Sequence, residues 1–169
     1  LAEQVVAEAV ASGQDIVTVN PVVVLGPGDL NLISGDLILK ARRLGPLLPV
    51  TSGGVAVVDV RDVARWHVAA AEHGRSGERY ILGTANYKYR ELFDMIAETL
   101  GVLRPRFTLP DFLPPLLARL IDLARAAGIA TPIDANQTLL ATRNVFFDYG
   151  KTWAELGAPH IDMRRSLRD

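Results

Sequence analysis

One stretch, from Thr18 to Asp29, constrains the fold of this chain more than any other. It reads Thr-Val-Asn-Pro-Val-Val-Val-Leu-Gly-Pro-Gly-Asp, a β-branched apolar run that carries a proline and closes on a glycine-rich turn. The nearly continuous apolar residues over 15–19 predict a strand buried on both faces of a parallel sheet. Regular pairing should end at Pro21, because proline cannot donate to a sheet ladder. Ligands of open parallel sheets bind beyond the carboxyl ends of the strands, so this end is a candidate binding site.

Composition narrows the class of protein. The 169 residues carry a net charge of −1, so nothing points to a nucleic-acid partner. The absence of cysteine excludes a disulfide framework, a thiolate zinc site and a cysteine nucleophile, and it fits a reducing compartment. His67, His73 and His160 lack the spacing of metal ligands, so no metal site is expected. No apolar run approaches about 20 residues and no signal peptide is visible, which predicts a cytoplasmic protein without a membrane partner.

The rest of the chain alternates between helical and strand patterns, which favours an α/β fold. Helices are expected over 1–12, 35–44, 59–74, 89–100, 114–127, 134–142 and 149–156, and strands over 55–58, 79–83 and 144–147. Ser34 should cap the second helix, and Asp59 and Asp62 should serve helix capping rather than acid–base chemistry. His67 shares the expected apolar face of its helix and should be a packed core residue. The chain begins without methionine and inside a helical pattern, which predicts a fragment of a longer protein.

Four segments, in order, resemble the extended short-chain dehydrogenase/reductase family. The likeness is greatest to its dihydroflavonol-4-reductase-like and NAD-dependent epimerase/dehydratase members. Leu1–Gln4 is similar to the continuation of the family's catalytic helix, and Asn20–Gly28 to its Pro-x-x-x-x-Gly-Pro strand end. The other matching segments are Val57–Ala64 with Gly77–Gly83, and Phe147–Lys151 with Glu155–Gly157. Each segment is weak alone, and the ordered set is specific.

The resemblance implies the C-terminal part of a Rossmann-type extended short-chain dehydrogenase/reductase, with a substrate-binding subdomain. Residues 1–29 would be the last catalytic-helix segment and a strand of the dinucleotide-binding domain. Residues 30–169 would be mainly the substrate-binding subdomain, with 55–74 returning to the Rossmann part. The family implies NAD or NADP and a tyrosine acid–base aided by a lysine. This sequence contains neither Tyr-x-x-x-Lys nor G-x-G-x-x-G, so no catalytic residue is predicted in it, and the chain alone should be inactive.

With the resemblance, the Thr18–Asp29 stretch yields a predicted site. The residues expected to contact the nicotinamide are Asn20, Pro21, Val22, Val23 and Val24. The residues expected to contact the substrate are Gly26, Pro27, Gly28, Asn31 and Ser34. The alternative is structural: Pro21 merely ends a strand, and the glycines and proline make an ordinary turn.

Three functions follow as hypotheses. The leading one is a reductase that converts a ketone to a secondary alcohol, or the reverse, on a small-molecule substrate. The second is a nucleotide-sugar epimerase or dehydratase. Such enzymes commonly carry Asn and Tyr where this chain has Val23–Leu25, and an Arg where it has Gly53–Ala56, which favours the reductase. The third is a non-catalytic NAD(P)-sensing or scaffold protein. A homodimer is also predicted, with a contact that covers helix 1–12 or strand 15–20.

Overall fold

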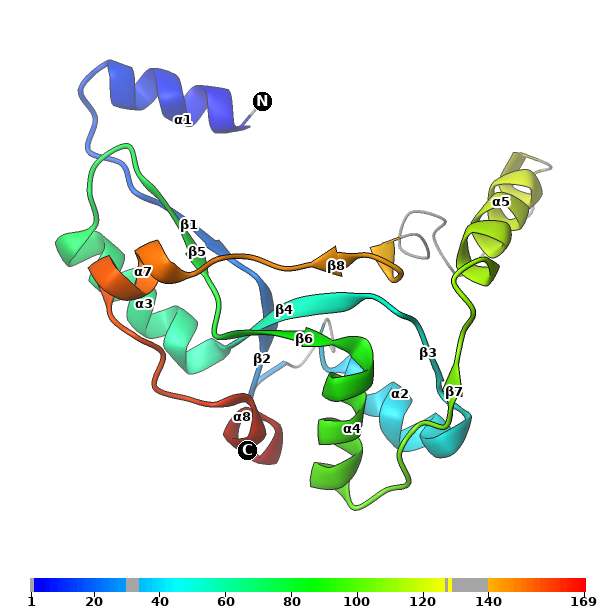
Figure 1. Ribbon diagram of the computed structural model, residues 1–169. Helices are drawn as coiled ribbons and strands as arrows, with labels where there is room; N and C mark the ends of the chain where they lie inside the picture. Colours follow the sequence, from blue (N-terminus) through cyan, green and yellow to red (C-terminus); the bar gives the residue numbers. More distant parts are fainter. Residues whose placement is uncertain (1, 30–33, 127, 129–139) are drawn as a thin grey trace.

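A computed structural model of the chain describes residues 2–29, 34–126, 128 and 140–169 (Figure 1). Helices and strands alternate as expected for an α/β fold. The helices are α1 (Ala2–Ala11), α2 (Asp36–Leu44), the 3-10 turn η1 (Gly45–Leu47), α3 (Val60–His73), α4 (Tyr89–Leu100), α5 (Leu113–Ala126), α7 (Gly150–Leu156) and α8 (Met163–Arg168). The strands are β1 (Thr18–Pro21), β2 (Val23–Leu25), β3 (Pro49–Val50), β4 (Gly54–Asp59), β5 (Arg79–Leu82), β6 (Ala85–Lys88), β7 (Phe107–Thr108) and β8 (Asn144–Val145).

Strand β4 is the centre of the described fold. All six of its residues are buried, as expected of a strand covered on both faces. It pairs in parallel with β2 and β8 and antiparallel with β6. Val55 and Val57 face a core shared with α2, α4 and α8, whereas Val58 faces a second core formed with α3 and α7. The two cores place one layer of helices on each face of this strand (Figure 1).

The run that begins at Thr18 changes partner at Val22. Before that residue, β1 pairs in parallel with β5, Thr18 opposite Arg79. After it, β2 pairs in parallel with β4, Val23 opposite Val57. The prediction that regular pairing ends at Pro21 is therefore confirmed. The expected burial on both faces is wrong for the described structure, because β1 is half-exposed and has β5 as its sole partner among the described strands.

The helix that follows β4 buries a different face from the one predicted. Its buried residues are Asp62, Val63, Trp66 and Ala70. His67 is exposed, and its Nδ1 lies 2.8 Å from the carbonyl oxygen of Val63, so the expectation of a core histidine is wrong. Apolar residues occupy both sides of this helix, and the sheet beneath it selects the side that carries Trp66.

Two helices stand apart from the body of the molecule (Figure 1). No residue of α1 is buried, and α5 buries Pro114 and Ala118 while several of its leucines stay exposed. Within the described ranges, no helix combines the length and the hydropathy needed to cross a bilayer. The helix predicted over 134–142 falls largely outside the described residues.

Candidate functional site

A cavity of about 540 Å³ opens at the carboxyl end of β2. Its wall is the strand end and the turn that follows, closed on one side by Val60 at the start of α3. The lining residues are Val22, Val23, Val24, Leu25, Gly26, Pro27, Gly28, Asp29, Ser34 and Val60. We call this cavity 1. It gathers most of the residues predicted from the Thr18–Asp29 stretch at one place.

The turn in cavity 1 depends on Gly26 and Asp29. Gly26 has a φ of +133°, and a Cβ there would lie 2.9 Å from Val60 Cγ1, so only glycine fits without a shift. Asp29 Oδ2 accepts hydrogen bonds from the backbone N–H groups of Ser34 (3.0 Å) and Gly35 (2.8 Å). The predicted cap by Ser34 is therefore wrong: the N-cap position of α2 is Gly35, and the side-chain acceptor at the start of the helix is Asp29. The predicted substrate contact Asn31 lies outside the described residues.

A second cavity, of about 450 Å³, lies beside the first and shares Val22 and Val23 with it. Asn20 and Pro21 line this cavity 2, together with residues from three other strands and from the segment after β8. Those further residues are Val55, Ala56, Arg79, Ile81, Val145 and Phe147. The predicted cofactor residues are thus divided: Asn20 and Pro21 line cavity 2, Val24 lines cavity 1, and Val22 and Val23 line both.

Sequence reasoning missed the far wall of cavity 2. Ile81, Val145 and Phe147 come from segments about 60 to 125 positions further along the chain, and none belongs to a motif that indicates binding. Val145 and Phe147 are large apolar residues that keep 38% and 40% of their surface exposed, an arrangement that suits contact with an apolar ligand. The short apolar run Val145-Phe146-Phe147 was the signal available, and it predicted only a strand.

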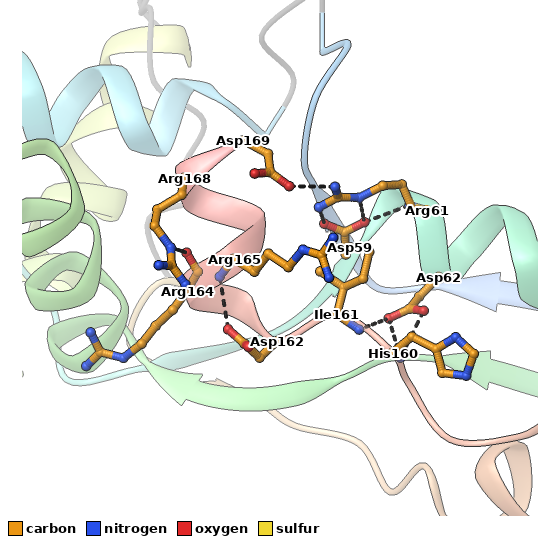
Figure 2. Close-up of polar contacts among 10 residues, drawn as sticks. All are labelled: Asp59, Arg61, Asp62, His160, Ile161, Asp162, Arg164, Arg165, Arg168 and Asp169. Carbon is orange, nitrogen blue, oxygen red and sulfur yellow. Dashed lines mark hydrogen bonds and ion pairs between the residues drawn. The ribbon is translucent and has the colours of Figure 1, made fainter.

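An ion pair supports the junction beneath cavity 1 (Figure 2). Asp59, fully buried, caps α3 by accepting from the backbone N–H of Arg61 (2.8 Å), as predicted. Its two oxygens also accept from the Arg61 guanidinium, Nε and Nη2, each at 2.9 Å. The remaining Arg61 nitrogen, Nη1, contacts Asp169 Oδ2 at 2.5 Å. Arg61 is therefore occupied by two carboxylates, one on each side.

This pair gives a pH-dependent contribution to stability. Burial alone would raise the pKa of Asp59, but the hydrogen bonds and charge of Arg61 outweigh it and hold that pKa below its usual value. A lowered folded-state pKa stabilises the fold above the unfolded-state value of about 3.9 and loses that contribution as the pH falls through the folded-state pKa. We expect urea midpoints of the wild type to fall more steeply below about pH 4 than those of Asp59→Asn. Parallel slopes in the two proteins would contradict this account.

Asp62, one turn into α3, has a structural role different from the predicted capping. Its carboxylate accepts from the backbone N–H groups of His160 and Ile161, at 3.0 to 3.1 Å (Figure 2). It also pairs with Arg65 Nη2 at 3.0 Å. The side chain thereby ties the segment before α8 to α3. No cluster of His, Cys, Asp or Glu side chains suited to a metal ion occurs among the described residues.

Comparison with known proteins gives the family. No family model matches the chain. It is 32% identical to a putative dihydroflavonol 4-reductase of Synechocystis, over 99% of this chain and 50% of that protein. The chain belongs to the extended short-chain dehydrogenase/reductase family. Cinnamoyl-CoA reductase 2 of Arabidopsis thaliana, another reductase of this group, is 36% identical over 65% of this chain and 32% of its own length.

Solved structures agree with the family and the Rossmann-type fold. The crystal structure of gox2253 matches 99% of this chain and 51% of its own, with a TM-score of 0.81 and 30% identity. A nucleoside-diphosphate-sugar epimerase from Pseudomonas aeruginosa matches 98% of this chain and 50% of its own, with a TM-score of 0.75 and 27% identity. The chain spans about half the length of the curated relatives it matches, and the match lies in their C-terminal half. The predicted resemblance and fold class are thus confirmed.

Proposed function

We propose that this chain is the C-terminal part of an NAD(P)-dependent reductase that interconverts a ketone and a secondary alcohol, similar to dihydroflavonol 4-reductase. The observation that carries the proposal is the apolar lining of the two cavities at the end of the Thr18–Asp29 run. Valines, Leu25, Ile81 and Phe147 dominate their walls. Such walls suit a hydrocarbon or aromatic body with a single reacting carbonyl. The charged lining residues are Asp29 in cavity 1 and Arg79 in cavity 2, and Arg79 pairs with Glu3 at 2.7 Å.

Two further observations argue against a sugar nucleotide. A Cβ at Gly53 would lie 2.4 Å from the carbonyl oxygen of Ala141, and one at Gly54 would lie 2.6 Å from the Phe146 ring. An arginine at Gly53 or Gly54, two positions of the segment where epimerases of this family tend to carry one, would therefore clash with its neighbours. Arg61, which follows the cavity 1 residue Val60 in α3, is bound to Asp59 and Asp169. A diphosphate would gain no free cation from these positions.

Within this proposal, the nicotinamide would contact Asn20, Pro21, Val22, Val23 and Val24, and the substrate would lie against Gly26, Pro27, Gly28 and Ser34. The cofactor is NAD or NADP, as the family's nicotinamide-bound members support. The strand end offers backbone groups and apolar side chains to the ring, and cavities 1 and 2 adjoin there through Val22 and Val23. The acid–base groups of the reaction would come from outside this sequence.

The test is hydride transfer by the protein that carries this chain together with the preceding half. We expect NADPH or NADH to be consumed with dihydroquercetin, which is a ketone, and not with UDP-glucose. The 169-residue chain alone serves as a control and should give no turnover, since it lacks Tyr-x-x-x-Lys. The Pseudomonas aeruginosa match favours a nucleotide-sugar epimerase as the second candidate, and conversion of UDP-glucose without net NADH consumption would establish it. Cofactor binding without any turnover would support the sensor or scaffold function.

We also propose a cytoplasmic homodimer formed through α1. Val5 on this helix is 60% exposed, and no residue of the helix is buried. An amphipathic helix whose apolar residues stay partly exposed is stabilised when a second copy covers its apolar face. Light scattering should give a dimer for the wild type and a shift towards monomer for Val5→Glu, with Glu8→Gln as a matched control. A monodisperse wild-type monomer would contradict this.

A further inference from the structure

One asparagine side chain holds the aromatic wall of cavity 2. Asn86, on β6, donates from Nδ2 to the carbonyl oxygen of Phe147 at 2.8 Å. Its Oδ1 accepts from the Phe147 backbone N–H at 3.3 Å and from the Tyr149 hydroxyl at 2.7 Å. The Asn86 amide thus binds both the backbone N–H and the carbonyl oxygen of Phe147, as a neighbouring strand would. It also binds the hydroxyl of Tyr149, two residues further along the chain.

Asn86 holds the segment after β8 firmly because Tyr149, one of its partners, is itself held in place. Its ring stacks on Trp153 with centroids 5.8 Å apart and is 6% exposed. Burial raises the pKa of Tyr149 to about 12, so the hydroxyl keeps its proton and remains a donor to Asn86 at any physiological pH. The Trp153 indole N–H in turn donates to the carbonyl oxygen of Gly83 at 3.1 Å. The chain from Phe147 to Trp153 is therefore held to β6 and its preceding turn.

The held residue is an exposed apolar one. Phe147 keeps 40% of its surface accessible while its backbone makes two side-chain hydrogen bonds, and its side chain lines cavity 2 beside Val145 and Ile81. We call these two hydrogen bonds the backbone clamp, since they fix the backbone of Phe147 where this residue lines the cavity.

We propose that Asn86 is a positioning residue that fixes Phe147 as the specificity wall of cavity 2, so that the cavity selects ring-bearing ketones over small aliphatic ones. The proposal rests on the proposed reductase function. Asn20 and Pro21, the proposed nicotinamide contacts, also line cavity 2, so the ring of the ketone would lie beside the nicotinamide there, against Phe147. Asn86 acts through Phe147 and is not expected to contact the ligand, because it is not among the residues that line the cavity.

The experiment measures binding rather than turnover. Methyl groups of Val23, Ile81 and Val145 are followed by NMR while the 169-residue chain is titrated with benzylacetone, a phenyl ketone, or with butanone, which has no ring. We expect shifts at these methyls with benzylacetone. Asn86→Ala should weaken benzylacetone binding about fivefold and leave butanone unchanged. Asn144→Ala is the matched control, since that amide contacts Lys88 Nζ and not Phe147, and it should bind like the wild type.

Phe147→Leu gives a second route to the same answer if Asn86→Ala folds poorly. It keeps the backbone clamp, removes the ring and should lose the same preference for benzylacetone. Equal weakening of both ketones by Asn86→Ala, or wild-type affinity in that variant, would overturn the positioning role. Absence of methyl shifts in the wild type would overturn cavity 2 as a ring site. That failure would be distinct from failure of the reductase proposal, which is decided by hydride transfer in the assay with the preceding half.

Discussion

Asp62→Ala should lower the free energy of unfolding by about 3 kcal/mol or more. The carboxylate is 1% exposed and accepts from the N–H groups of His160 and Ile161, so its removal leaves two donors and Arg65 without their shared partner. A donor left unsatisfied in a buried place costs about 1–3 kcal/mol. The loss should appear as a lower urea midpoint with an unchanged m-value, and as faster amide exchange at Ile161.

A matched aspartate separates this effect from the loss of any charge. Asp36 pairs with Lys40 one turn along α2, and its side chain is 51% exposed. Exposed pairs of this kind are worth less than about 1 kcal/mol, so Asp36→Ala should be mild. If the two variants lost similar stability, the hydrogen bonds between Asp62 and the segment before α8 would contribute no more than an exposed ion pair.

The Thr18–Asp29 run shows how far the sequence alone can predict this fold. Its β-branched composition and Pro21 predicted a strand, an end to regular pairing and a ligand-facing terminus, and the first two are confirmed. The change of partner at Val22 was not predictable, because nothing in the run itself indicates which strand each part of it pairs with. Pairing with β5 and then with β4 depends on chain segments more than 30 positions away.

The same reason explains the errors at α3 and α2. Both flanks of α3 carry apolar residues, so periodicity alone could not decide between the side with Val68 and the side with Trp66. The side chain of Trp66 decides it by filling the core against Tyr80 and Leu82. Ser34 has a side chain suited to capping, but Asp29 accepts the hydrogen bonds from the backbone N–H groups of Ser34 and Gly35 instead.

The sequence predicted only part of the candidate site, because only part of it is formed by consecutive residues. Cavity 1 consists mainly of consecutive residues, and a local motif can indicate those. Cavity 2 requires Phe147 to lie beside Asn20, which only the tertiary arrangement brings about. The assignment of either cavity to cofactor or substrate, and the division of the chain at residue 29, stay predictions.

Gly83→Ala should be nearly as damaging as the loss of Asp62. A Cβ at Gly83 would lie 2.0 Å from Tyr149 Cε1 and 2.4 Å from Cζ, so the ring that caps the turn between β5 and β6 must move. Overpacking of this kind costs typically about 1–3 kcal/mol, and here the displaced ring is also stacked on Trp153. Urea unfolding should show the loss, and the near-ultraviolet circular dichroism of the Tyr149–Trp153 pair should weaken.

The control is Gly150→Ala, one residue from the same tyrosine. A Cβ there would lie 3.2 Å from Asp148 Oδ1, at the end of a side chain that can turn aside, and the residue opens helix α7. Alanine is the better helix former, so this change should be neutral within about 1 kcal/mol.

Removing the ring with Tyr149→Val should also relieve the cost of Gly83→Ala, so the double variant should be more stable than additivity predicts. Strict additivity would mean that the ring does not cause the damage.

Gly83→Ala should also disturb cavity 2. The displaced Tyr149 ring carries the hydroxyl that donates to Asn86, and Asn86 binds Phe147, which lines the cavity.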